Sequence, residues 1–237
     1  MELNAVEQNL KKIYDSWDSG KMAENNGYSA MFRMGFPDEF LDNGRPLLMY
    51  VGQECLNCTS IKTQPWVRKY QTVQKTKIRD HEIGEGANRS PFWSFYRSLT
   101  EFGFNVVWNN LDKLHPKDQQ RLCQEDAVRS NQPYGQSSMS VLQREIELLK
   151  PRVIVFAVGS GKYTASLASA FSIPTDKLCR FEPAPQKPLT DITAVLGIQD
   201  TQILWTYHPS YLRRCKFKLY RPVLAEIKRI IEQEDIV

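Results

Sequence analysis

The sequence has no long apolar run and no strong excess of charge of either sign. Its longest apolar stretches, such as "VIVFAV" (153–158), are far too short to cross a bilayer, and no basic segment followed by an apolar one opens the chain. The formal net charge is only +4, which neither demonstrates nor excludes a nucleic-acid partner. With 41% hydrophobic and 24% charged residues, the composition indicates a soluble globular protein. We expect it to be cytoplasmic, with no membrane partner.

Metal-ligating residues are also scarce, with five cysteines and three histidines. Cys55 and Cys58 form a C-x-x-C, which could be half of a zinc or iron–sulfur site. The other cysteines, Cys123, Cys179 and Cys215, are scattered and supply no second close pair. The pattern therefore favours reduced, free thiols, and we expect no metal and no other cofactor.

No internal repeat is present, but four short apolar runs stand out, at 46–52, 104–110, 152–159 and 202–207. Each is partly β-branched or aromatic and is bounded by polar, glycine or proline residues, as is typical of buried parallel strands. Helix-length segments separate them. A chain of 237 residues fits one domain of this kind. The sequence predicts a single three-layer α/β/α domain with a mainly parallel four-stranded central sheet.

Several segments carry helix signals. Ser90 and Pro91 open one amphipathic segment, and Ser140 with Gln143 forms a capping box in another. Further helices are predicted after Gly161, near the C-terminus from Pro222 and near the N-terminus. We expect residues 1–44 to be a helical extension packed on a domain formed by residues 45–237, and the polar stretches 67–90 and 180–195 to be surface loops.

Polar residues follow each predicted strand. They are Gln53 and Glu54, Asn109 and Asn110, Gly159 to Gly161, and His208 to Ser210. Because ligands of open parallel sheets bind at the carboxyl ends of the strands, we expect these loops to share one crevice. A carboxylate, a carboxamide and an imidazole together suit recognition of a base or sugar with acid–base or electrostatic chemistry. Taken singly, each is equally compatible with an ordinary turn residue.

A phosphate-binding loop is excluded at "GSGK" (159–162). The first glycine of that motif would fall on Phe156, and Tyr163 replaces the required Ser or Thr. We therefore reject a nucleoside triphosphatase.

Five segments in this order resemble the uracil-DNA glycosylase superfamily. They are "GQEC" (52–55), "SPFWSFYRSL" (90–99), "VVWNNLDKL" (106–114), "LLKPRVIVFAVG" (148–159) and "YHPSYLRR" (207–214). The likeness runs from about residue 45 to 220 and is closest to the single-strand-selective monofunctional branch. It implies a DNA repair enzyme of base excision repair, which hydrolyses the N-glycosidic bond of uracil or a related damaged base after flipping the nucleotide from the stack.

The resemblance assigns roles to particular residues. His208 matches the histidine that donates to uracil O2 as negative charge develops there. Asn110 matches the base-reading asparagine, with Asn109 as the alternative if the register differs by one. Glu54 falls where the family places the Asp or Asn that positions the attacking water, and Gln53 precedes it in the base-binding loop. The base-stacking aromatic is matched by Trp66 or by Phe92, and either can instead be a core aromatic.

The segment after His208 resembles the loop that enters the minor groove of DNA and fills the hole left by the flipped base. Such a segment can also be only a solvated charged surface. Its candidate DNA contacts are Ser210, Tyr211, Leu212, Arg213, Arg214 and Lys216. The implied partner is single- or double-stranded DNA containing a damaged base, bound by a monomer.

The first loop departs from the family pattern. Cys55, Leu56 and Asn57 stand where the family has proline and then tyrosine or glycine. Two hypotheses therefore remain. The chain is either a glycosylase, or a catalytically altered glycosylase-like domain that binds nucleic acid, a base or a protein partner without cleavage.

Overall fold

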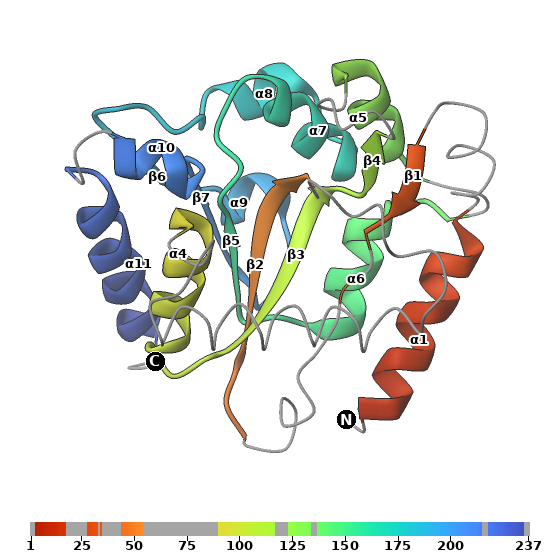
Figure 1. Cartoon of the computed structure of the whole chain (residues 1–237), viewed down its shortest axis with the longest axis horizontal. Coiled ribbons are helices and arrows are strands. Elements are labelled where there is room, and N and C mark those ends of the chain that lie inside the picture. Colours follow the sequence, from red (N-terminus) through yellow and green to blue (C-terminus); the bar gives the residue numbers. More distant parts are fainter. Residues whose placement is uncertain are drawn as a thin grey trace.

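A central sheet of five strands organises the domain (Figure 1). The computed structural model describes residues 3–17, 28–32, 34, 44–54, 90–116, 123–133, 137–214 and 218–234. The strand order is β3-β2-β5-β7-β6. The strands are β2 (Leu47–Glu54), β3 (Asn105–Asp112), β5 (Val153–Phe156), β6 (Leu189–Asp191) and β7 (Gln202–Thr206).

The predicted parallel strands are present, but the predicted number of strands is wrong. β2 pairs in parallel with β3 and β5, and β5 pairs in parallel with β7. The fifth strand, β6, pairs antiparallel with β7 and lies inside the segment 180–195 that was predicted to be a loop. β6 has only three residues, so it shows no alternation that sequence reasoning could detect. Its pairing with β7 stabilises it.

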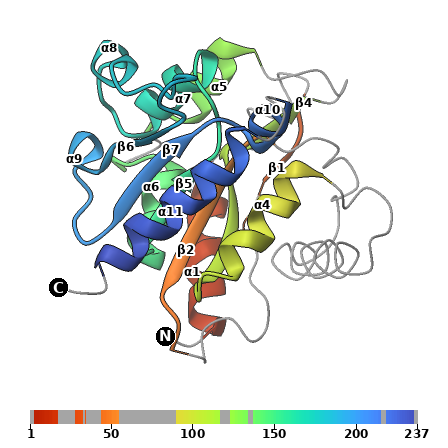
Figure 2. The same cartoon turned by 90° about the vertical axis from the view of Figure 1, so that its left-hand side faces the viewer.

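Helices pack on both faces of this sheet (Figures 1 and 2). Side chains of α1 (Leu3–Ser16), α6 (Val141–Leu149) and α7 (Lys162–Ala170) share a core cluster with Met49 and Val51 of β2. The opposite cluster joins Leu48 and Tyr50 to helices α4 (Pro91–Thr100), α10 (Pro209–Arg214) and α11 (Tyr220–Glu234). Successive β2 residues therefore enter opposite cores, as the two-residue period of a strand requires.

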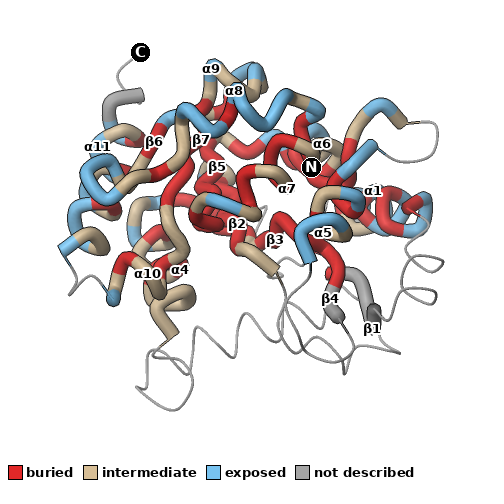
Figure 3. The backbone as a smooth tube through the Cα atoms, turned by 90° about the horizontal axis from the view of Figure 1, so that it is seen from above, coloured by how far each residue is buried: buried red, intermediate tan, exposed pale blue. Residues whose placement is uncertain are grey.

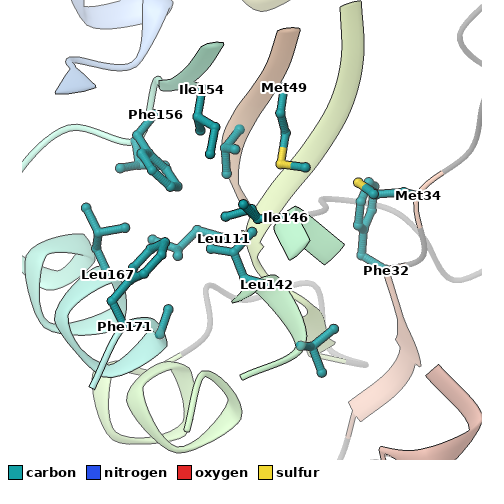
Figure 4. Packing of buried hydrophobic residues seen from close by; sticks show 14 of the residues in the cluster. Phe32, Met34, Met49, Leu111, Leu142, Ile146, Ile154, Phe156, Leu167 and Phe171 are labelled. Carbon is teal, nitrogen blue, oxygen red and sulfur yellow. The ribbon is translucent and has the colours of Figure 1, made fainter. Parts of the chain in front are cut away.

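The core is continuous from the sheet into the helices. Seen from above, buried residues run through the strands and the inward sides of the surrounding helices (Figure 3). In the first cluster, Ile154 and Phe156 of β5 share the core with Leu167 of α7 (Figure 4). Phe171, the residue that follows α7, belongs to the same cluster. The rings of Phe156 and Phe171 meet edge to face, with centroids 6.1 Å apart.

The helix signals of the sequence are confirmed locally. Pro91 is the first residue of α4, and α6 begins with the predicted capping box, in which Ser140 and Gln143 bond reciprocally. Shorter elements complete the described chain, namely β1 (Tyr28–Met31), β4 (Leu114–Pro116), α5 (Gln124–Ser130), α8 (Thr175–Cys179) and α9 (Thr193–Leu196). β1 and β4 form a separate antiparallel pair. Among the described helices, none has the length and apolarity needed to cross a membrane.

A buried ion pair connects α1, β3 and α6. Lys113 and Glu145 are essentially inaccessible to solvent, and their charged groups lie 2.7 Å apart. Tyr14 of α1 donates to the same carboxylate at 2.6 Å and accepts from the backbone N–H of Met34 at 3.0 Å. Asn109 also donates to Glu145, at 2.9 Å. Because each charged group has several partners, the network offsets part of the desolvation cost of burying it.

Candidate active site at the carboxyl ends of the strands

The ends of β2 and β3 bring the predicted polar residues to one edge of the sheet. In the parallel register, Gly52 lies opposite Asn110, and Glu54 lies opposite Asp112. Phe92, in the first turn of α4, reaches the same place. The Phe92 ring is stacked on the imidazole of His208, with centroids 5.8 Å apart and planes 18° apart. The backbone of β2 at Gly52 and side chains from β3, α4 and the turn after β7 therefore lie close together.

Gly52 makes this close approach possible. A Cβ atom at position 52 would lie 2.8 Å from Asn110 Oδ1 and 2.8 Å from Phe92 Cε2. Both contacts are shorter than van der Waals distances. The absence of a side chain on Gly52 thus allows the amide of Asn110 and the ring of Phe92 to lie against the strand.

His208 is oriented by the turn that carries it. The backbone N–H of Ser210 donates to His208 Nδ1 at 3.2 Å, and the His208 carbonyl accepts from Tyr211 N–H at 2.8 Å in the first turn of α10. Because Nδ1 acts as the acceptor, a neutral His208 carries its proton on Nε2. The second nitrogen can therefore donate a hydrogen bond to a ligand.

The two asparagines of β3 point to opposite faces, and only one of them reaches the site. Asn109 is engaged in the buried network, where its amide bonds Glu145 and its oxygen accepts from Lys113. Asn110 lies on the other face, is 2% exposed, and accepts from Trp108 Nε1 at 3.1 Å through Oδ1. Its Nδ2 is buried without a hydrogen-bond partner in the part of the chain that is described. An unpaired buried donor is costly to the folded protein.

Glu54 lies beneath the start of α7. Its side chain is 5% exposed, and Oε1 accepts from Tyr163 Oη at 3.2 Å and contacts Lys162 Nζ at 3.5 Å. Both partners come from the first turn of α7, directly after Gly161, whose φ of 73° suits glycine. These contacts fix the orientation of the Glu54 carboxylate.

Asp112 is a second buried carboxyl beside Glu54, and no sequence motif had singled it out. It is fully buried, and Asn131 donates to its Oδ1 at 2.9 Å. Burial, followed by the Glu54 carboxylate, raises the pKa of Asp112 to about 7, although Lys162 acts in the opposite direction. Asp112 therefore changes charge near neutral pH, within the site.

Gln53 connects the first loop to the end of β5. Its Nε2 donates to the carbonyl of Val158 at 2.7 Å. The next residue, Gly159, has a φ of 78°, and a Cβ there would lie 3.9 Å from the backbone nitrogen of His208. The end of β2 and the turns after β5 and β7 are thus packed on one another.

Residues 210–214 of the predicted DNA-binding segment lie in the short helix α10. The rings of Tyr211 and Tyr207 are tilted against each other with centroids 4.4 Å apart, and Arg214 is exposed, with Nε donating to the Ser210 carbonyl at 3.3 Å. Arg213 is half-buried. Leu212 differs from the expectation of a DNA-facing side chain. It is completely buried in the cluster of α4 and α11, because position 212 is on the inner side of α10.

Some predicted residues lie outside the described part of the chain. These are Trp66, Lys216, Cys55 and Cys58. Among the residues that are described, no three His, Cys, Asp or Glu side chains come together as a metal site, and Cys123 and Cys179 are exposed free thiols.

Sequence reasoning also missed Trp108. It is two residues before Asn110 and therefore on the same face of β3, so strand alternation could have identified it.

A mostly parallel sheet with polar side chains gathered at its carboxyl edge is typical of α/β domains that bind a ligand there. Comparison with protein families identifies the kind of α/β domain to which this chain belongs. The model of the uracil DNA glycosylase superfamily matches residues 73–231, more than half of the chain, and the protein belongs to this superfamily. This membership indicates a glycosylase-type function on DNA. The match includes Phe92, Asn110 and His208, whereas Glu54 precedes it. A comparison with curated proteins found no match.

Proposed function

We propose that the protein is a monofunctional DNA glycosylase that hydrolyses the N-glycosidic bond of uracil or a related damaged base after base flipping. The observation that carries this proposal is that Asn110 and Phe92 both pack against Gly52 while the Phe92 ring stacks on His208. These side chains supply an amide to read a base edge, an aromatic surface to stack on it and an imidazole to bind its oxygen.

The chemistry requires stabilisation of separated charge. As the glycosidic bond breaks, the base acquires negative charge and the sugar becomes a cation. His208 Nε2 donates to the base oxygen that becomes negative, and a preorganised donor of this kind typically contributes about 3 kcal/mol to transition-state stabilisation. Ser210 N–H supports this role, because it holds Nδ1 as the acceptor.

Glu54 acts on the sugar side of the reaction. Its carboxylate, oriented by Tyr163 and Lys162, positions the attacking water and stabilises the sugar cation electrostatically. Gln53 shapes the pocket beside it through its bond to Val158. Phe92 is the stacking aromatic in this mechanism, because its ring contacts His208 and the strand at Gly52.

The DNA backbone is bound beside the base site by α10. Arg213 and Arg214 of α10 contact phosphates, and so does Lys216, which lies outside the described residues. Ser210 and Tyr211 follow His208 closely in the chain and approach the flipped nucleotide. The resemblance to the single-strand-selective branch makes single-stranded DNA the first substrate to test.

The deciding experiment measures excision directly. Purified protein is incubated with single- and double-stranded oligonucleotides that contain uracil, hydroxymethyluracil, hypoxanthine or xanthine, and abasic sites are then cleaved with alkali. Strand cleavage of at least one substrate is expected, with His208→Ala protein as the control for contaminating glycosylases. If the protein binds these oligonucleotides but leaves all of them intact, the domain binds without catalysis and the proposed activity is wrong.

A further inference from the structure

Trp108 holds the side chain that reads the base. Trp108 and Asn110 are two residues apart on β3, so both side chains project from the same face. The indole Nε1 donates to Asn110 Oδ1 at 3.1 Å. The indole is itself confined by three aromatic rings, with centroids 4.9 Å away at Phe32, 5.0 Å at Trp93 and 6.1 Å at Phe92.

We propose that Trp108 is a specificity-determining residue, because it fixes which end of the Asn110 amide is presented to the ligand. An indole N–H can only donate, so the amide atom that faces it must be the oxygen. Rotating the amide by 180° would place its NH₂ group against the indole N–H, two donors facing each other in a buried place. The donor-only indole N–H therefore determines which way the Asn110 amide is turned.

The fixed orientation leaves Nδ2 as the group that needs a ligand. Asn110 is 2% exposed, and Nδ2 is buried without a partner among the described residues. A base that places a carbonyl oxygen next to Nδ2 accepts the hydrogen bond that Nδ2 otherwise lacks. A base that places an amino group there leaves two buried donors facing each other and unpaired.

This inference rests on the proposed function and narrows its substrate class. The fixed Asn110 amide favours bases that have a carbonyl oxygen at the edge facing it, as in uracil or hypoxanthine. It rejects the parent bases cytosine and adenine, which carry an amino group at that position. Trp108 acts through Asn110 and is a positioning residue, since no contact between the indole and the ligand is required.

Trp108→Phe tests the inference, because it keeps an aromatic ring and removes only the N–H donor and part of the packing. Trp93→Phe is the matched control, because it alters the same aromatic group without a bond to Asn110 in the structure. The readout is the preference for uracil over cytosine, measured in two ways. One is the ratio of excision rates, and the other is the ratio of dissociation constants for oligonucleotides carrying 2′-fluorinated deoxyuridine or deoxycytidine, which bind without being cleaved.

The wild-type protein and Trp93→Phe should prefer uracil, and Trp108→Phe should lower that preference by about tenfold or more. A merely structural role would change thermal stability and affinity for both bases alike, leaving the ratio unchanged. Retention of the full preference in Trp108→Phe, or its absence in the wild type, overturns the inference. Discrimination in binding without any excision would instead overturn the proposed enzyme activity while supporting the role of Trp108.

Discussion

The ring of Phe92 lies nearly parallel to the imidazole of His208, with the centroids 5.8 Å apart. This contact joins α4 to the turn after β7, two elements that are more than one hundred residues apart in the chain. It places an aromatic surface beside the proposed hydrogen-bond donor.

Replacing His208 by alanine should abolish excision while leaving the fold intact. The side chain is half-buried outside the two core clusters, and the hydrogen bond that it accepts from Ser210 lies within its own turn, so its removal should leave the core unchanged. Loss of a preorganised donor typically lowers the rate by about 100- to 1,000-fold. Single-turnover rates and thermal unfolding are measured on the same samples. A large loss of thermal stability in the variant would indicate a structural role for His208.

Replacing Gly52 by alanine should displace the side chains that pack against it and lower activity. In Gly52→Ala the new Cβ would lie 2.8 Å from both Asn110 Oδ1 and Phe92 Cε2, so at least one of these groups must move. We expect excision to fall by about 100-fold, because misplacement of binding groups by about 1 Å has effects of that size. The double variant Gly52→Ala, Phe92→Leu lacks the clash with the Phe92 ring. It should recover thermal stability that is lost in the single variant. Unchanged activity in Gly52→Ala would contradict the described packing.

Asp112 should make the stability of the protein decrease as the pH rises toward neutrality. Its pKa is about 7 in the folded protein and near 3.8 when unfolded, so the folded state binds the extra proton between these values. The stability contribution is present below about pH 4 and is lost as the pH rises through 7. At about 1.4 kcal/mol per pKa unit, the upper limit of this effect is roughly 4 kcal/mol.

Asp112→Asn removes this titration. Asparagine keeps an oxygen to accept from Asn131, so the variant should be more stable than the wild type at pH 8 and by a clearly smaller margin at pH 5. Urea unfolding at the two pH values measures the difference. Parallel pH profiles for the two proteins would show that Asp112 does not titrate in this range.

Breaking the buried ion pair should destabilise the protein more than removing it completely. Lys113→Met leaves the buried carboxylate of Glu145 without its cation and should cost about 3–5 kcal/mol of unfolding free energy. In Lys113→Met, Glu145→Leu neither charge remains, and much of that loss should be recovered. Urea unfolding of the two variants gives the comparison. Equal stability of both would mean that the pair contributes through packing rather than charge.

Binding of DNA by α10 should depend on salt. Removing the guanidinium groups in Arg213→Ala, Arg214→Ala should weaken binding to undamaged and damaged oligonucleotides alike, and should reduce the slope of log affinity against log salt by about one per lost phosphate contact. Lys228→Ala, which removes an exposed lysine of α11, serves as the control and should leave the slope unchanged. If the double arginine variant keeps the salt slope of the wild type, the phosphate contacts are made by residues other than these two arginines.

Parts of the site were predictable because strand ends can be read locally. The apolar runs ending at Gly52 and at the HPS turn locate two loops, and the parallel topology they imply brings those loops together. The choice between Asn109 and Asn110 was not predictable in this way, since a shift of one residue exchanges the two faces of a strand. In the structure, Asn109 is engaged with Lys113 and Glu145 in the buried network, and Asn110 lies on the opposite face of β3.

The sequence by itself determined the alternation of apolar runs and amphipathic segments, and with it the mostly parallel sheet and the four loops at its carboxyl edge. These features depend on local periodicity and on capping residues such as Ser140. Tertiary structure alone decided that β6 joins the sheet, that Leu212 is buried, and that Trp108 and Asp112 lie beside Asn110 and Glu54. Each of these outcomes depends on which partner a side chain or a backbone edge meets across the fold, and local sequence pattern does not contain that information.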